Sequence, residues 1–143
     1  MDAMQDAGYR LRLAEGYVQE ASEDLTLKRW RSCVDNSQLA AKNAAKAALA
    51  LLGPVGRTHN PAPLLRQALG DGRFPAELTG DVQRLAETAE LLGPPVPIST
   101  DYGDEDARLT PWELLAESDA GSALSMAEEA VAKAQALVHA WPP

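Results

Sequence analysis

The sequence is short of the residues that build strands and disulfides. It contains one cysteine, one isoleucine and seven valines. A single cysteine, Cys33, excludes an intrachain disulfide and a paired-cysteine metal or redox site. The shortage of β-branched residues disfavours a sheet, whereas 26 alanines and 20 leucines favour helix. The composition therefore predicts an all-α protein. Cys33 lies on the apolar flank of its expected helix, so we expect a small buried packing residue.

Long apolar runs are also missing. No stretch approaches the roughly 18 consecutive apolar residues of a membrane-spanning helix. The N-terminal residues MDAMQDAGYRLR lack the basic start and apolar segment of a secretory signal. We therefore expect a cytoplasmic protein without a membrane partner, and the length suits a single domain over residues 1–143.

Basic residues are few and unevenly placed. The net charge of -8 argues against nonspecific nucleic-acid binding by the whole surface. Residues 28–66 nevertheless carry seven basic and one acidic side chain, whereas the rest of the chain carries six basic and twenty acidic ones. A binding surface for an anion is therefore expected within residues 28–66.

Apolar residues recur at steps of three and four along four segments, as they do on one face of a helix. The first expected helix covers residues 3–21, and the second is about 25 residues long and ends before Gly53-Pro54. The third begins at Leu78 or Asp81 and ends at Leu92, and the fourth runs from about Ser118 to Trp141. A short helix is expected after Asn60 as N-cap, with Pro61 in its first position. These elements predict an antiparallel up-and-down bundle of four main helices plus short helices.

The connection between the third and fourth main helices is rich in proline and charge. The segment GPPVPIS at residues 93–99 is predicted not to be helical, and residues 100–108 are predicted to form an ordered loop. Thr110 and Glu113 have capping-box spacing, which predicts a short helix there. Trp112 and Trp141 are expected to pack against helix ends. The acidic residues at 101–106 lack the ligand spacing of a calcium loop, so no metal is expected.

Several pieces of the chain, taken in order, resemble the HEPN domains. The pieces are Glu23-Asp24-Leu25, Gln38 to Ala40 with Lys46-Ala47, Thr58-His59 with Leu64-Leu65, Asp101-Tyr102-Gly103, and the last helix from Glu117 to Val138. The resemblance implies an HEPN-like helical bundle. It also implies that His59, Lys46 and Tyr102 converge on a polar pocket.

The sequence departs from the family at several of these positions. Lys42 stands where the family often has glutamate, Asp101 where it has arginine, and Gly103 where it has proline. The ribonuclease branch of the family carries an arginine separated from a histidine by four to six residues. No arginine stands at that distance before either histidine, because the positions hold Leu52, Gly53 and Pro54 before His59 and Ala132, Lys133 and Ala134 before His139.

A row of polar residues follows one flank of the second helix. Arg31, Asp35, Gln38, Lys42 and Lys46 fall within about an 80° arc together with Lys28. This basic ridge is either a solvated flank that neutralises acidic helices or the open wall of a groove for a phosphate or carboxylate.

The turn after the second helix carries Arg57 and His59 beside the start of a short helix. This arrangement either anchors the turn through hydrogen bonds or forms an anion site. The candidate ligand-binding residues of the ridge and the turn are Arg31, Gln38, Lys42, Lys46, Arg57, His59 and Tyr102.

The sequence favours a noncatalytic HEPN-like binding module, without a cofactor or catalytic residue, that forms a homodimer. The resemblance implies a nucleotide ligand or a partner such as a minimal nucleotidyltransferase, in a toxin–antitoxin type of system. One alternative is a ribonuclease in which His59 acts as general acid or base and Arg57 or Arg66 steadies the phosphate. Another alternative is a purely structural helical adaptor.

Overall fold

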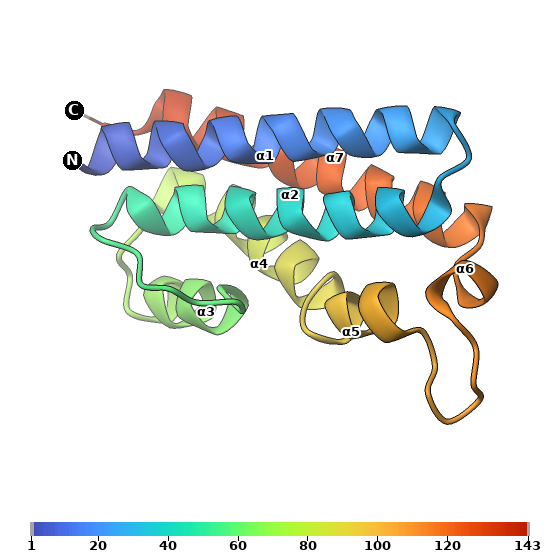
Figure 1. Cartoon of the computed structure of the whole chain (residues 1–143). Coiled ribbons are helices and arrows are strands. Elements are labelled where there is room, and N and C mark those ends of the chain that lie inside the picture. Colours follow the sequence, from blue (N-terminus) through green and yellow to red (C-terminus); the bar gives the residue numbers. More distant parts are fainter. Residues whose placement is uncertain (1, 143) are drawn as a thin grey trace.

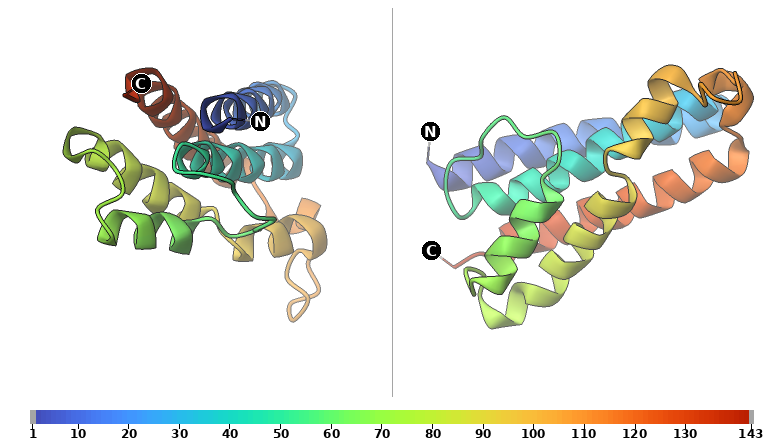
Figure 2. Two further views of the ribbon diagram at one scale, coloured as in Figure 1. Left: turned by 90° about the vertical axis from the view of Figure 1, so that its left-hand side faces the viewer. Right: turned by 90° about the horizontal axis from the view of Figure 1, so that it is seen from below.

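Three long helices lie side by side in the computed structural model, which describes residues 2–142 (Figure 1). They are α1 (Ala3–Thr26), α2 (Trp30–Ala50) and α7 (Glu117–Ala140). α2 and α7 run antiparallel to α1, and α4 (Thr79–Leu91) crosses them obliquely (Figure 2). Within residues 2–142 only one isolated β-bridge forms and no strand, so the prediction of an all-α bundle is confirmed. The shorter elements are α3 (Ala62–Gly70), the 3-10 helix η1 (Ala76–Leu78), α5 (Pro95–Tyr102) and α6 (Pro111–Leu114).

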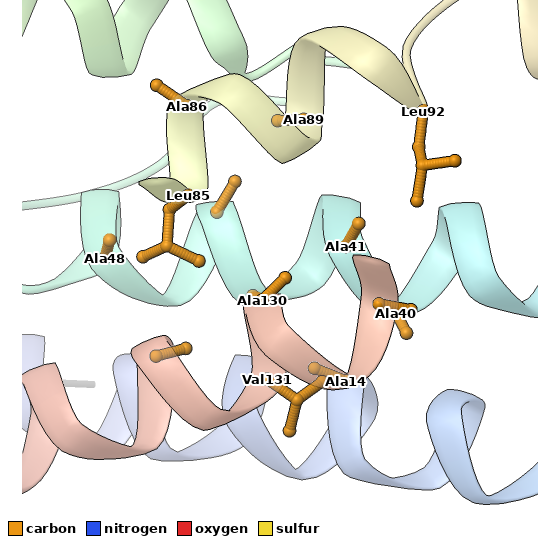
Figure 3. Packing of buried hydrophobic residues seen from close by; sticks show 14 of the residues in the cluster. Ala14, Ala40, Ala41, Ala48, Leu85, Ala86, Ala89, Leu92, Ala130 and Val131 are labelled. Carbon is orange, nitrogen blue, oxygen red and sulfur yellow. The ribbon is translucent and has the colours of Figure 1, made fainter. Parts of the chain in front are cut away.

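α2 is the central helix of the bundle. It packs against α1, α7, α4 and α5, and seven of its buried residues are alanines. Because alanine is small, neighbouring helices can approach α2 closely from several directions. Figure 3 shows Ala40, Ala41 and Ala48 on this helix within the same core as Leu85 of α4 and Leu92, the C-cap of α4. The core therefore combines alanine surfaces on the long helices with leucines from the shorter one.

The first two helices differ in length from the prediction. α1 continues five residues beyond the predicted end, to Thr26. Its last turn is fixed by Asp24, which is buried and accepts a hydrogen bond of 2.8 Å from Asn36 Nδ2 on α2. α2 is shorter than predicted because Lys28 has a left-handed backbone, with φ of 60°, and lies in the turn before the helix.

The boundaries of α3 and α4 also correct the prediction. The N-cap of α3 is Pro61 rather than Asn60, and its first residue is Ala62. α4 begins at Thr79, so Gly80 lies inside the helix and does not delay the start to Asp81. The predicted capping box is confirmed, since Thr110 Oγ1 accepts from Glu113 N–H and Glu113 Oε1 accepts from Thr110 N–H.

The prediction that residues 93–99 are not helical is wrong for residues 95–99. α5 begins at Pro95, with Pro94 as N-cap and Pro97 in the third helical position. The N–H groups of the first turn have no acceptor within the helix, so prolines in these positions cost no hydrogen bond. The same helix includes Thr100 to Tyr102, and the loop predicted over residues 100–108 is therefore shorter.

Gly103 ends α5 with a backbone that only glycine adopts readily. Its φ is 71°, and a Cβ atom there would collide with the carbonyl oxygen of Leu109. Proline, which the resemblance would place at this position, has φ fixed near -65°. The departure of Gly103 from the family pattern therefore has a conformational reason.

Cys33 and Trp141 are packing residues, as predicted. Cys33 is fully buried, its Sγ donates a weak hydrogen bond to Ala120 O, and burial raises the pKa of its thiol. Trp141 meets Phe74 edge to face, with ring centroids 6.0 Å apart. This contact holds the end of α7 against the connection between α3 and η1. None of the described helices is both long enough and apolar enough to cross a bilayer.

Candidate functional site

The basic ridge predicted on α2 is covered in its middle by α5. Arg31 Nε donates a hydrogen bond of 2.7 Å to the carbonyl oxygen of Thr100, and Arg31 lies 3.6 Å from Asp101 in an ion pair. The Thr100 side chain is fully buried against α2. The prediction of a continuous ridge open to solvent is therefore wrong, because α5 was not expected to be a helix that packs there.

A short chain of hydrogen bonds runs beneath α5 along α2. Asp35 Oδ1 accepts from Gln38 Nε2 at 3.2 Å, and it also lies 3.4 Å from Thr100 Oγ1, whose hydroxyl has a closer acceptor in Pro97 O at 3.0 Å. Together with the bond from Arg31 to Thr100, these contacts join two residues of α2 to one residue of α5, and Gln38 is linked to them through Asp35. Asp35 therefore orients the amide of Gln38 from one side.

Beyond α5, the ridge residues Gln38 and Lys42 meet His59 in a small cleft. We call it the Gln38 cleft. Its volume is about 10 Å³, which is close to the minimum that one water molecule requires. Four segments form it: α2, the connection after α2, the end of α4 and the start of α5. The remaining lining residues are Ala41, Asn60, Pro61, Ala89, Leu92, Gly93 and Pro97.

Gln38 is the most unusual residue of this cleft. Its side chain is 4 % exposed, and Nε2 is bonded to Asp35. Its Oε1 atom is buried and has no hydrogen-bond partner among residues 2–142. An unpaired buried acceptor costs about 1–3 kcal/mol, so a donor from a water molecule or a ligand at this oxygen would stabilise the protein.

The other end of the cleft is positively charged. Lys42 lines the cleft, and Lys46 lies one helical turn further along α2. The pKa of Lys46 is lowered, first by burial and then by the nearby charges of Arg10 and Lys42. Arg10 Nε makes no hydrogen bond in the described part of the chain, but it lies 3.9 Å from Asp6 Oδ1 in an ion pair. Lys42 and Lys46 form no ion pair among residues 2–142, so an anion beside them would be stabilised.

Replacing Lys46 with glutamine is expected to raise the free energy of unfolding by less than about 1 kcal/mol near pH 7, since the side chain remains partly solvated. The lowered pKa means that folding disfavours the charged form, and this cost is complete below the folded-state pKa. The cost decreases as the pH rises through that value towards the ordinary 10.5. Urea denaturation of both proteins should therefore show a smaller difference near pH 10. A difference that grows with pH would contradict this assignment.

The remaining candidate residues do not line the cleft. Arg57 is exposed in the connection after α2, and Tyr102 is 63 % exposed at the end of α5. The structure thus does not bring Lys46 and Tyr102 to His59 in one cleft, as the resemblance implied. Arg66 is held by Glu90 through two hydrogen bonds, and its hydrogen bonding lowers the pKa of the Glu90 carboxyl.

The cleft offers recognition groups and no metal site. It presents one buried amide acceptor, one ammonium group and one imidazole. Within residues 2–142, no three acidic, histidine or cysteine side chains gather in a way that could hold a metal ion. The arrangement suits a ligand that carries a hydrogen-bond donor and a negative charge.

A comparison with protein families assigns the fold. The family described as HEPN domain matches residues 7–137. The chain belongs to the HEPN domain family. The match runs from α1 into α7, so it covers nearly the whole bundle and confirms the resemblance found in the sequence. No protein of curated function matches the chain. The HEPN membership gives the fold, and the ligand has to be inferred from the residues of this chain.

Proposed function

We propose that this HEPN domain is a noncatalytic binding module and that the Gln38 cleft recognises a nucleotide. The buried and unpaired Oε1 of Gln38 is the observation that supports the proposal most strongly. A nucleotide base can supply an amino or imino donor to this oxygen, and a phosphate can bind Lys42 and His59 at the mouth. Because the interior admits about one water molecule, only one polar atom of the ligand would reach Gln38 directly.

The noncatalytic assignment rests on the lack of a suitable arginine to act together with His59. No arginine precedes His59 at the spacing of the family's ribonuclease branch. Arg66, the second candidate to steady a phosphate, is already held by Glu90. RNA that is cleaved by the purified protein, and no longer cleaved by the His59→Ala variant, would instead establish the ribonuclease alternative.

A partner protein is the second candidate for the same region. Leu91, Ile98 and Tyr102 are each more than half exposed on α4 and α5, two helices that contribute other residues to the cleft. Exposed apolar side chains of this kind favour a protein contact. A minimal nucleotidyltransferase in a toxin–antitoxin type of pair is the partner that the resemblance implies, and the homodimer also remains a prediction.

The nucleotide proposal is tested by thermal unfolding with ATP, GTP and cyclic nucleotides. A ligand at a hundredfold excess over its Kd should raise the Tm by about 5–10 °C for a domain of this size. Lys42→Glu should reduce that rise, because it replaces the ammonium at the cleft with a carboxylate, which repels the phosphate.

The matched control is Arg12→Glu, which makes the same charge change at an exposed arginine of α1. This variant should retain the rise in Tm. The proposal fails if no nucleotide shifts the Tm, or if both variants reduce the shift equally.

A further inference from the structure

One of the four segments that form the Gln38 cleft is held without a fully buried apolar side chain. α2 and α4 each bury several apolar residues in the core, and the connection after α2 ends at the buried Pro61. α5, by contrast, buries a single side chain, the polar Thr100. Its apolar residues Ile98 and Tyr102 are 57 % and 63 % exposed, and Val96 is only partly buried. Separation of α5 from α2 would therefore expose little apolar surface.

The strongest polar contacts of α5 all go to Arg31. This side chain bonds to the carbonyl oxygen of Thr100 and pairs with Asp101, beneath the start of α2 in Figure 1. Its guanidinium carbon also lies 5.9 Å from the ring centroid of Trp112 on α6. Trp112 is 73 % exposed, so the prediction that it packs against a helix end is wrong. One partly exposed arginine thus joins α2, α5 and α6, where water or another anion can compete for it.

Glycines mark both ends of α5. A Cβ atom at Gly93 would lie 2.9 Å from the carbonyl oxygen of Ala89, and Gly103 has the positive φ described above. The observed structure requires glycine at both positions, and glycine also permits the large changes in backbone angle that a hinge needs. The helix between them can move as a unit, because its hydrogen bonds are internal.

The Gln38 cleft is closed by this helix. Gly93 and Pro97 line it from the side of α5, and its volume of about 10 Å³ is far below the roughly 300–1,000 Å³ of small-molecule sites. In this state only one polar atom of a ligand can reach Gln38. Displacement of α5 would expose Gln38 together with Asp35, which lies beneath Thr100. A larger contact with the ligand therefore depends on the wall that α5 forms.

We propose that α5 is a hinged cover of the Gln38 cleft, that Arg31 latches it to α2, and that the ligand is held fully when the cover is open. The closed state predominates in the free protein. A ligand that binds the open state then has its apparent affinity lowered in proportion to the fraction of open molecules. The regulatory role rests on the function proposed above, whereas the opening of α5 does not.

Hydrogen–deuterium exchange without any ligand tests the opening. Amides of α5 should exchange at least about tenfold faster than those in the middle of α4, which is fixed in the core. Arg31→Met removes the hydrogen bond and the ion pair but keeps an unbranched stem. It should accelerate exchange in α5 by about tenfold or more and change exchange in α4 less than about twofold. Unchanged exchange in α4 would also show that the variant is folded.

The matched control is Arg12→Met, which makes the same change at an exposed arginine of α1. It should leave the exchange of α5 within about twofold of the native protein. Two results would overturn the cover: exchange of α5 in the native protein as slow as that of α4, and equal exchange of α5 in Arg31→Met and Arg12→Met.

Calorimetric titration with ATP tests the regulatory role. Arg31→Met should raise the apparent affinity severalfold, because a larger fraction of the molecules is open. If Arg31 held the phosphate directly, loss of its charge would instead lower the affinity. An equal or lower affinity of Arg31→Met would therefore overturn the regulation. If ATP binds neither the native protein nor the variants, the nucleotide proposal fails, and the exchange measurements still decide whether α5 opens.

Discussion

Replacing Leu85 with alanine is expected to lower the free energy of unfolding by about 2–5 kcal/mol. Leu85 is 1 % exposed and points from α4 towards α2 in the core (Figure 3). Truncation removes three carbon atoms from a site lined by alanines, which have no long side chains to fill the space. Urea denaturation monitored by circular dichroism measures the loss.

The matched control for this substitution lies on the same helix. Leu91 is 68 % exposed, so Leu91→Ala should change the free energy of unfolding by less than about 0.5 kcal/mol. Because the end of α4 forms one wall of the Gln38 cleft, Leu85→Ala should also weaken ligand binding, while Leu91→Ala should not remove that wall. Equal effects of the two substitutions on stability would contradict the placement of α4.

Enlarging Ala40 to leucine is expected to lower the free energy of unfolding by about 1–3 kcal/mol, although leucine is the more apolar residue. Ala40 is fully buried on α2, in the same cluster as Ala14 of α1 and Val131 of α7 (Figure 3). Three extra carbon atoms at this position require α1 or α7 to move away. Thermal and urea unfolding would both report the cost.

The control for Ala40 is Ala132, which is exposed on α7. Ala132→Leu adds the same atoms where they can extend into water, so its effect should remain within about 0.5 kcal/mol. If Ala40→Leu were as stable as the native protein, the close approach of helices at the alanine surfaces of α2 would be wrong.

The long helices were predictable because their apolar residues repeat at helical spacing over many turns. The start of α7 and the capping box at Thr110 were also predicted from local sequence, the capping box from the spacing of Thr110 and Glu113. The end of α1 was missed because it depends on Asp24, whose hydrogen bond to Asn36 is a contact between helices. Periodicity within one segment carries no information about such a contact.

The missed helix α5 had the largest consequence for the site. Its prolines suggested an irregular segment, although Pro95 and Pro97 both fall in the first helical turn, where proline is tolerated. The combination of clustered prolines followed by Gly103 could have signalled a short helix. Without α5, neither the burial of Gln38 nor the hydrogen bond from Arg31 to Thr100 could be predicted.

The candidate residues were grouped correctly only in part. Gln38 and Lys42 share a helix face by their spacing, but their meeting with His59 depends on how the connection after α2 folds back. The exposure of Trp112 was missed for a similar reason. Its sequence neighbours indicate a short capped helix, but they do not show that α6 lies at the rim of a hollow lined by Lys28 and Arg29.

The central claim, that the Gln38 cleft binds a nucleotide, is tested most directly by the NMR signals of the imidazole side chains during titration with ATP. The chain has only two histidines, and His139, which does not line the cleft, serves as an internal control. The account predicts that the His59 signals shift with a saturable dependence on ATP while the His139 signals stay in place. Unchanged His59 signals at ATP concentrations that raise the Tm, or equal shifts of both histidines, would contradict it.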